Sequence, residues 1–539
     1  MHSNLLIPIF LYPEIHFRFF RHFPSLLYRK YPEAIFDMPR RLGPGNDLPV
    51  VLIINDINRF QLDVVKVQVA LSHKSKPPLV LDFDDPEEHA VDHPFSFQSS
   101  AFVFSIPRNK LDTGQYHVNC TARIKKNNRS YTVINDNLFM TSKLPYSCYV
   151  SNSQLPGDEF CSYGDMHVHS QYSQSHVEFG PPVSIIDLFS KCYGNDFTVV
   201  TDHSYDLACE MNNYLKIDEG VSRWKSIRSD ASSHNFLNPF ILGEEISCIN
   251  SNNKTVHLCG IGIKDFVPGS IDGARRNANK SKSLSIEDAI KSVHEQGGIA
   301  YAAHPGSKIS FMQKYFLKRG IWKQEDFKTK LDAIQAVNNG FGNSWNKAKN
   351  LWIKELLKGN KLPLLGGNDS HGDFNRYRAI SVPFFSIHEN FARHFSWIKT
   401  GIYGKISTEQ QLIASIKNGA TFVSSGPFLG MSKTKSPHEN IICNDEINLN
   451  VECITILLKS SYEFGIPYLF KLYYGKINAS RETVYFSKYL SIGEYDAFPE
   501  VSVSNLKGKG YLRAEAEFRK SDGSTNFAAT SPCYFNLIS

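Results

Sequence analysis

The sequence predicts an α/β barrel or a parallel α/β sheet that is flanked by two β-rich domains. Between residues 163 and 427, short apolar strands alternate with amphipathic helices, a rhythm typical of a parallel sheet covered by helices. Before and after this region, short β-rich runs are separated by turn residues, as in small β-sandwiches. With 539 residues, the chain is long enough for about two to four domains.

Composition and charge exclude several classes of protein. Apolar residues make up 42% of the chain and charged residues 21%, which is enough apolar material for folded cores and too little charge for a disordered chain. The 59 basic and 53 acidic side chains leave a formal net charge of +6, an excess too small to predict a nucleic-acid or membrane partner. No apolar run reaches the roughly 18 residues that a membrane span requires.

Residues 1–44 are rich in aromatic residues and arginine, and we expect an N-terminal extension that packs on a later domain. A basic segment that lies on a membrane surface is the alternative. The apolar stretch 5–12 contains Pro8, follows no Lys or Arg and precedes no small-residue cleavage site, which disfavours a secretory signal. The ten cysteines form no CxxC pair, so we predict reduced thiols in a cytoplasmic protein.

The flanking domains are predicted from their β-rich texture. Residues 45–150 are expected to form a β-sandwich-like domain, with strands at 50–54, 63–71, 79–83, 102–106, 116–124 and 131–135. Residues 430–539 are expected to form a C-terminal β-domain, with strands at 447–457, 468–474, 483–486, 511–518 and 533–538.

The middle region, residues 160–429, is predicted to be the α/β barrel. Its expected strands are 197–201, 299–303 and 364–366, and its expected helices are 286–295 and 345–357. In barrel enzymes, the chemistry lies at the carboxyl ends of the strands. His203 and His304 both close strongly apolar strands, so we expect them at that end of the barrel.

Two short motifs place pairs of polar side chains at the same end. His167 and His169 are two residues apart on an extended segment, which directs both imidazoles to one face. Asp369 and His371 repeat this spacing directly after the strand 364–366. A lone His-x-His pair is common on solvated strands and is weak evidence by itself.

Taken together, these motifs predict a metal site. Any one of the histidines is explained as an ordinary core or surface residue. A ring of unpaired polar groups from five or six successive β-units would be costly without an ion to bind. Imidazoles and carboxylates without cysteine favour Zn, Mn or Fe.

The ordered motifs resemble the PHP (polymerase and histidinol phosphatase) superfamily of metallohydrolases, and within it the CehA/McbA-type branch. The resemblance rests on six motifs, at residues 164–170, 199–203, 242–247, 256–260, 297–306 and 366–372. The segments 368–376 and 414–429 and the flanking β-domains point to the branch. The resemblance implies a distorted seven-stranded (β/α) barrel with a site for two or three metal ions.

The resemblance also implies which residues bind the ions. His167, His169, Glu245 and Asp369 would hold one ion, and Glu245, His257 and His304 a second. Glu245 would bridge the two ions. It is preferred to Glu244 because the family's glutamate lies two residues after a glycine, here Gly243.

A third ion in the family uses counterparts of His203 and His371, together with an acid or a histidine a few residues beyond His-x-His. At that place this chain has Gln174 and Ser175, which are poor ligands, and His176 comes one position late. Either His176 serves with a shifted loop or the centre holds two ions.

The chemistry that the resemblance implies is hydrolysis by a metal-bridged hydroxide, with Glu245, Asp369 and His304 as catalytic residues and no Ser or Cys nucleophile. Arg376 and Arg378 are candidates to clamp an anionic substrate, with ordinary surface salt bridges as an equal alternative. Asp202 is expected to orient a ligand rather than to bind metal.

Three functions follow as hypotheses. The first is a metal-dependent phosphoesterase, the second a hydrolase of carboxylic or carbamic esters, and the third a catalytically idle barrel whose β-domains bind a partner. The nearly complete ligand set argues against the third. The basic loop 269–283 either faces the substrate or is solvated, and we favour the solvated alternative. Oligomeric state and substrate identity are not predicted.

Overall fold

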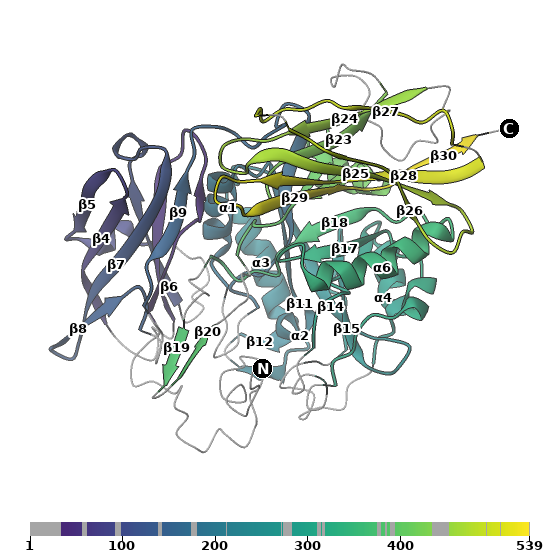
Figure 1. Ribbon diagram of the computed structural model, residues 1–539. Coiled ribbons are helices and arrows are strands. Elements are labelled where there is room, and N and C mark those ends of the chain that lie inside the picture. Colours follow the sequence, from purple (N-terminus) through teal and green to yellow (C-terminus); the bar gives the residue numbers. More distant parts are fainter. Residues whose placement is uncertain are drawn as a thin grey trace.

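The computed structural model describes residues 34–55, 62–91, 99–137, 143–173, 180–211, 213–270, 272, 283–309, 314, 318–373, 379–382, 385–388, 394–433, 452–491, 493–506 and 508–537. Figure 1 shows a β-domain built from the N-terminal residues, a central α/β part, and β-sheets of the C-terminal residues that lie over the central part.

The N-terminal β-domain consists of two antiparallel sheets with a shared core. One sheet contains β1 (Ala34–Asp37), β3 (Leu48–Asn55) and β6 (Ser99–Ile106). The other contains β2 (Arg41–Leu42), β9 (Tyr146–Val150), β7 (Gly114–Lys126), β4 (Asp63–His73) and β5 (Lys76–Phe83), with β8 (Arg129–Ile134) on β7. Alternate residues of β7 are buried in one hydrophobic cluster with side chains of both sheets, as a sandwich requires.

The six strands expected in this domain are confirmed, with small differences at their ends. Strands β1 and β2 lie before residue 45, the expected start of the domain, and still pair with β3 and β9. Residues 34–44 therefore belong to the sandwich, while residues 1–33 lie outside the described part of the chain.

The central part is built on a ring of strands. In spatial order, these are β10 (Cys161–Val168), β11 (Phe197–His203), β14 (Phe240–Ile249), β15 (Thr255–Ile261), β16 (Ile299–Ala302), β17 (Ala333–Asn338) and β18 (Leu364–Gly367). Neighbours are parallel except at β15, which is antiparallel to both β14 and β16. A parallel bridge between Val168 and Ser370 joins the two end strands and closes the ring.

Helices pack against one face of the strands that form the ring. They are α1 (Val183–Tyr193), α2 (Ser204–Leu207), α3 (Ser222–Ser233), α4 (Ile286–Glu295) and α6 (Asn343–Leu357). In α4, Ile286, Ala289, Ile290 and Val293 are buried, the spacing of a single helix face, and the Ser285 side chain accepts a hydrogen bond from Asp288 N as its cap. The expected helices 286–295 and 345–357 are both confirmed.

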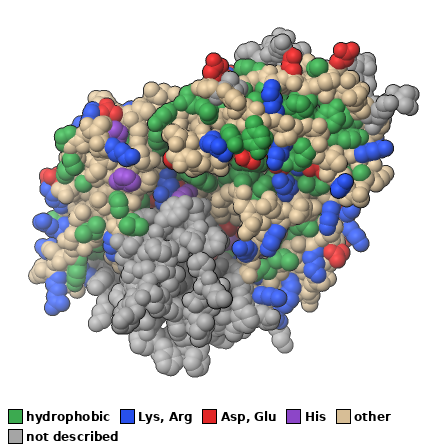
Figure 2. Space-filling model, in the orientation of Figure 1, with side chains coloured by type: hydrophobic (Ala, Val, Ile, Leu, Met, Phe, Trp, Pro, Cys, Tyr) green, Lys and Arg blue, Asp and Glu red, His purple; other side chains and the backbone are tan. Residues whose placement is uncertain are grey.

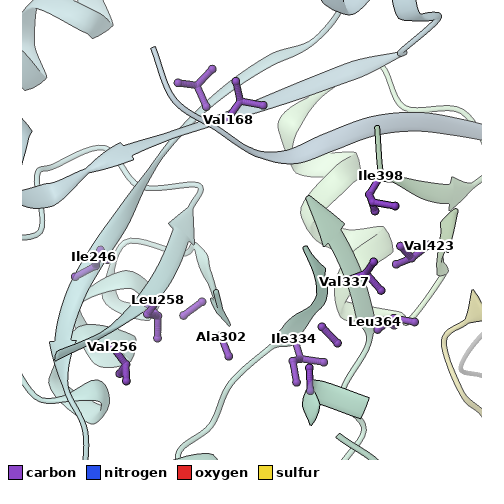
Figure 3. Packing of buried hydrophobic residues seen from close by; sticks show 14 of the residues in the cluster. Val168, Ile246, Val256, Leu258, Ala302, Ile334, Val337, Leu364, Ile398 and Val423 are labelled. Carbon is purple, nitrogen blue, oxygen red and sulfur yellow. The ribbon is translucent and has the colours of Figure 1, made fainter. Parts of the chain in front are cut away.

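Alternate strand residues pack into two hydrophobic clusters. The larger one lies between the strands and the helices, and Figure 3 shows members of it on β14 to β18, among them Ile246, Leu258, Ala302, Ile334 and Leu364. The other lies on the opposite face and includes Val199, Ile241, Tyr301 and Leu365. Helix α7 (Glu409–Lys417) contributes Leu412 and Ile416 to that second cluster.

The C-terminal strands continue the central sheet. Strand β10 also pairs with β21 (Lys399–Tyr403), which leads to β22 (Thr421–Ser424), β29 (Thr525–Thr530), β28 (Gly508–Arg519), β25 (Ile466–Lys476) and β26 (Thr483–Tyr489). Strand β30 (Cys533–Leu537) pairs with β28, and a second sheet contains β23 (Phe428–Ser432), β24 (Cys453–Lys459) and β27 (Glu500–Ser502).

The expected boundary between residues 429 and 430 falls inside β23, and the pairing of β22 with β29 joins the two regions in one sheet. Two further short ladders, β12 (Cys209–Glu210) with β13 (Asn213–Ile217) and β19 (Ala379–Val382) with β20 (Phe385–His388), lie outside these sheets. In the part of the chain that the structure describes, no helix is long and apolar enough to cross a membrane.

Candidate metal centre

Eight polar side chains from six segments of the ring meet in one cluster. They come from β10, β11, β14, β15, the turn after β16 and the turn after β18, and all but His304 are buried. They are His167, His169, His203, Glu245, His257, His304, Asp369 and His371. These are the residues that the sequence nominates as ligands, and the fold brings them together.

Strand register explains why Glu245 lies in the middle of this cluster. In the parallel ladder of β11 and β14, His203 lies directly opposite Glu245, and His203 Nδ1 is 2.6 Å from Glu245 Oε2. In the next ladder, His257 lies opposite Ser247, two residues further along β14, and His257 Nδ1 is 2.5 Å from Glu245 Oε1.

His304 completes the surroundings of the same carboxylate. Its Nε2 atom lies 2.8 Å from Glu245 Oε1. One carboxylate therefore faces imidazoles from three different segments of the ring, which is the arrangement expected of a bridging ligand.

A second group surrounds the other side of Glu245. His167 Nε2 and His169 Nε2 are 3.1 Å apart, and His169 Nε2 is 3.0 Å from Asp369 Oδ1. Both imidazoles lie 3.5 Å from Glu245 Oε2. These four residues could share one ion, because their ligand atoms all lie within 4.8 Å of one another.

A third group contains imidazoles alone. The ring of His169 stacks on that of His371 at a centroid distance of 4.4 Å, and the ring of His203 lies 4.2 Å from His169. The three can offer ligand atoms within 4.8 Å of one another. His176, the further ligand considered from the sequence, lies outside the described residues, so its participation stays a prediction.

Two of the candidate ligands lie in left-handed backbone. Asp369 has φ 52° and His304 has φ 32°, a region that side chains other than glycine rarely adopt. Such conformations are costly and are found where the surrounding structure holds them for function. Asp369 is held from its backbone, because its N–H donates to His167 O at 2.8 Å.

Three further side chains hold the imidazoles in place. Gln335 Oε1 accepts from His167 Nδ1 at 2.8 Å, and Ser173 Oγ lies 3.2 Å from His169 Nδ1. Asp272 Oδ2 accepts from His257 Nε2 at 2.9 Å. Partners on the far nitrogen fix the ring and determine which nitrogen faces the site.

None of these three partners is among the residues nominated from the sequence. Gln335 does have a recognisable signal, because it is a polar residue within the apolar strand β17. Asp272 and Ser173 lie in irregular segments where no periodicity marks them.

Two aspartates, Asp202 and Asp165, bind the backbone at the strand ends and belong to none of the three ligand groups, although Asp202 Oδ1 lies 3.9 Å from His169 Nδ1. Asp202 accepts hydrogen bonds from Ser170 N at 2.7 Å and Ser170 Oγ at 2.5 Å, directly after His169. Asp165 accepts from His167 N, from Asn368 Nδ2 and from Ser396 N. Burial raises the pKa of Asp165 to about 6, although these hydrogen bonds act in the opposite direction.

Glu244 and Glu245 have opposite environments although they are neighbours in the chain. Burial raises the pKa of Glu244 well above its ordinary value, and backbone N–H of Val267 is its hydrogen-bond donor, 3.2 Å from each carboxyl oxygen. Burial would raise the pKa of Glu245 too, but the imidazoles of His257 and His167 outweigh it and hold that pKa well below its usual range. The two environments therefore favour the ionised form at Glu245 and disfavour it at Glu244.

The chemistry of the donor set fits cations. His257 has a carboxylate on each side, with Asp272 Oδ2 2.9 Å from Nε2 and Glu245 Oε1 2.5 Å from Nδ1. Both carboxylates only accept, so a neutral imidazole donates to one of them and directs a lone pair at the other. In the tautomer that donates to Asp272, the lone pair of Nδ1 faces Glu245 Oε1. A positive ion between these atoms would satisfy both.

Two buried atoms without hydrogen-bond partners also indicate that the site fits a cation. Within the described residues, Glu245 Oε2 and His203 Nδ1 are buried and neither makes a hydrogen bond, although they lie 2.6 Å apart. Their short contact lacks the geometry of a hydrogen bond, and buried polar atoms left in this way are costly. These residues fit divalent ions that accept nitrogen and oxygen ligands, such as Zn, Mn or Fe.

The predicted substrate clamp, Arg376 and Arg378, lies outside the described residues. The same holds for the basic residues of the loop 269–283, whose solvated state was favoured. One described member of that loop, Asp272, is fully buried against His257, so this position is not solvated.

Comparisons with known proteins do not identify a family. No protein-family model matches the sequence, and no curated protein is significantly similar to it. Among solved structures, trypsin-activated alpha-2-macroglobulin from Escherichia coli aligns with 98% of this chain and 24% of its own, at 8% identity and a TM-score of 0.14. The native conformation of the E. coli protein aligns with 94% and 22%, at 9% identity and the same TM-score of 0.14. The chain thus spans about a quarter of those proteins, and scores this low carry no argument about its fold or activity.

Proposed function

We propose that the chain is a metal-dependent hydrolase of the PHP type, related to the CehA/McbA branch, and that it cleaves phosphoesters. The observation that carries this proposal is the position of Glu245 between two groups of imidazoles. Its Oε1 faces His257 and His304, and its Oε2 faces His203, His167 and His169. The closed ring of strands, whose successive strands and turns supply the candidate ligands, supports it further.

Bound divalent ions would lower the pKa of a coordinated water into the neutral range and neutralise charge on the attacked group. The protein's own part is to hold the ligands and to expose the site on one side. Glu245 joins the two ligand groups, and Asp369 adds the second carboxylate. Among the candidate ligands, His304 has the most exposed side chain, with 15% of its surface accessible, whereas the side chain of Glu245 has 0%. We place the substrate on the His304 side.

Charge favours an anionic substrate. The ligand set contains two carboxylates, Glu245 and Asp369, and otherwise imidazoles, which bind metal ions in their neutral form. Two divalent cations therefore exceed the negative charge of their ligands, and the loaded site carries a positive field in a buried, weakly screened environment. A phosphoester matches that field better than a neutral carboxylic or carbamic ester does.

The test compares substrates that share one leaving group. Protein purified with Mn, Zn or Fe is assayed against an aryl phosphate, the aryl acetate and the aryl carbamate, with and without a chelator. We expect the phosphate to be cleaved fastest and chelation to abolish turnover. Faster cleavage of the acetate or carbamate would establish the ester activity instead, and a metal-free protein inert towards all three would indicate a binding role.

We also propose a cytoplasmic location and a small-molecule substrate. All nine cysteines in the described part of the chain are free thiols, and eight of them are buried, as is usual in a reducing compartment. On the face shown in Figure 2, Lys and Arg side chains are spread over the described surface rather than gathered in one stripe. A nucleic-acid partner would favour such a stripe.

A further inference from the structure

Asp272 is a buried carboxylate that touches the candidate centre from outside. Its side chain has no exposed surface, and Oδ2 lies 2.9 Å from Nε2 of His257. The same oxygen lies 3.3 Å from Nε of Arg319. Asp272 belongs to none of the groups whose ligand atoms cluster closely enough to share an ion.

We propose that Asp272 is a positioning residue, which holds His257 so that Nδ1 faces Glu245, and that Arg319 holds Asp272 in turn. This inference rests on the proposed metal centre and adds to it a residue outside the ligand set. Asp272 contacts His257 and Arg319 contacts Asp272, so both act on the centre through His257.

The tautomer of His257 is the first step of the argument. An ion on Nδ1 needs the lone pair of that nitrogen, so the proton of His257 must then lie on Nε2, where Asp272 Oδ2 accepts it at 2.9 Å. Nδ1, which lies 2.5 Å from Glu245 Oε1, is then left as the ligand atom. A carboxylate on the far nitrogen also makes the imidazole more basic and thus a stronger ligand.

The backbone around Arg319 is the second step. A parallel bridge joins Arg319 to Thr255, two residues before His257 on β15, and Gly320 N donates to Thr255 O at 2.7 Å. This pairing places the guanidinium beside the strand that carries His257. Its Nε lies 3.3 Å from Asp272 Oδ2, so the guanidinium lies against the carboxylate that contacts His257.

His257 is also anchored through its backbone. Trp322 Nε1 donates to His257 O at 3.2 Å. The main chain of His257 therefore stays in place when Asp272 is changed, and the freedom that the change releases is rotation of the imidazole. Loss of Asp272 should thus alter the site without unfolding the strand.

The experiment measures metal binding rather than activity. Apo protein is prepared with a chelator and titrated with Co²⁺, and the dissociation constant and the visible absorption spectrum are recorded. Asp272→Asn keeps the shape of the side chain and removes its charge, and Asp272→Ala removes both. We expect Co²⁺ affinity to fall by about 10- to 100-fold, more in the alanine variant, with an altered spectrum. Asp272→Glu should recover part of the affinity.

The matched control is Asp332→Asn. Asp332 also accepts from an imidazole, His294 Nε2 at 2.7 Å, but His294 is not part of the cluster. This variant should bind Co²⁺ like the wild type. Wild-type affinity and spectrum in both Asp272→Asn and Asp272→Ala would overturn the inference while leaving the metal centre intact. Absence of Co²⁺ binding by the wild-type protein would instead refute the proposed function.

Discussion

His169 Nε2 lies 3.0 Å from Asp369 Oδ1, although 200 positions separate the two residues in the chain. The contact exists because β18 closes the ring against β10, with His169 N donating to Ser370 O at 2.8 Å. Ring closure and assembly of the candidate centre are therefore one structural event. Metal binding should accordingly stabilise the central part against unfolding.

Replacing Glu245 by Gln should strongly reduce turnover and metal binding while leaving the fold in place. The amide keeps the volume but loses the charge that faces the imidazoles of His203 and His257. We expect turnover to fall by at least about 100-fold and bound metal to decrease. Glu244→Gln is the control, because Glu244 is buried against Val267 N and belongs to none of the three ligand groups. Equal losses in both variants would mean that Glu245 has no special role.

Gly367 is expected to be indispensable for the position of His167. A Cβ atom at Gly367 would lie 2.8 Å from His167 Cβ and 2.8 Å from Gln335 Nε2, closer than atoms can pack. Gly367→Ala should therefore displace both and weaken metal binding about tenfold, at a cost of about 1–3 kcal/mol in the free energy of unfolding. Gly493→Ala, where no atom lies within 4 Å, should change neither quantity. Metal titration and denaturant unfolding decide between the two outcomes.

The buried lysine of β21 predicts a defined pH dependence. Burial lowers the pKa of Lys399 from 10.5 to about 8. Between these values the unfolded chain binds the proton and the folded chain does not, so this group makes the free energy of unfolding rise with pH. Below pH 8 the folded protein must carry the buried positive charge, and this lowers the free energy of unfolding by the full penalty of about 3 kcal/mol.

Lys399→Met should remove that penalty. The variant also loses the hydrogen bond that Lys399 Nζ donates to Ser396 O at 2.5 Å, which is worth about 1 kcal/mol. Denaturant unfolding at pH 7 should still show the variant to be more stable, with an advantage that shrinks from pH 8 to pH 10. An advantage that grows with pH, or a less stable variant at pH 7, would contradict the assignment.

Arg41, in the N-terminal β-domain, contacts both the central α/β part and the C-terminal region. Its Nε lies 3.0 Å from both carboxylate oxygens of Glu463 in the C-terminal region, and its Nη1 donates to Tyr193 O at the end of α1. Arg41→Met leaves Glu463 with little compensation and should cost about 3 kcal/mol in the free energy of unfolding.

A double-mutant cycle with Glu463→Gln separates this pair from its surroundings. We expect a coupling energy of about 2 kcal/mol. The exposed pair of Lys76 and Asp112 is the comparison, and its coupling should stay below about 1 kcal/mol. Equal coupling in the two pairs would show that Arg41 is no more than a surface contact.

Candidate ligands such as His203, His304 and Asp369 were predictable because each one ends or follows an apolar strand, whereas Glu245 and His257 were nominated from the resemblance to the PHP superfamily. His203 ends β11, and Asp369 follows β18, so strand periodicity alone places them at one end of the ring. Pairing register then brings His203 beside Glu245. Helix α4 was equally readable, because its apolar spacing and its Ser285 cap are local signals.

The features that could not be predicted from the sequence depend on contacts between segments that are distant in the chain. Strand β1 is four residues long and acquires its identity only by pairing with β3. The junction of β22 with β29 brings together segments about a hundred residues apart, which no local pattern records. Asp272 is likewise an ordinary loop aspartate until the fold places it against His257.

Anomalous X-ray diffraction from crystals of the purified protein, recorded on both sides of the Mn, Fe and Zn absorption edges, tests the central claim most directly. We predict at least two anomalous peaks, one on each side of the Glu245 carboxylate. Each should lie about 2.0–2.2 Å from its imidazole and carboxylate ligands. One peak should contact His167, His169 and Asp369, and the other His257 and His304. Peaks elsewhere, or ordered density for these side chains around hydrogen-bonded water alone after metal supplementation, would contradict the account.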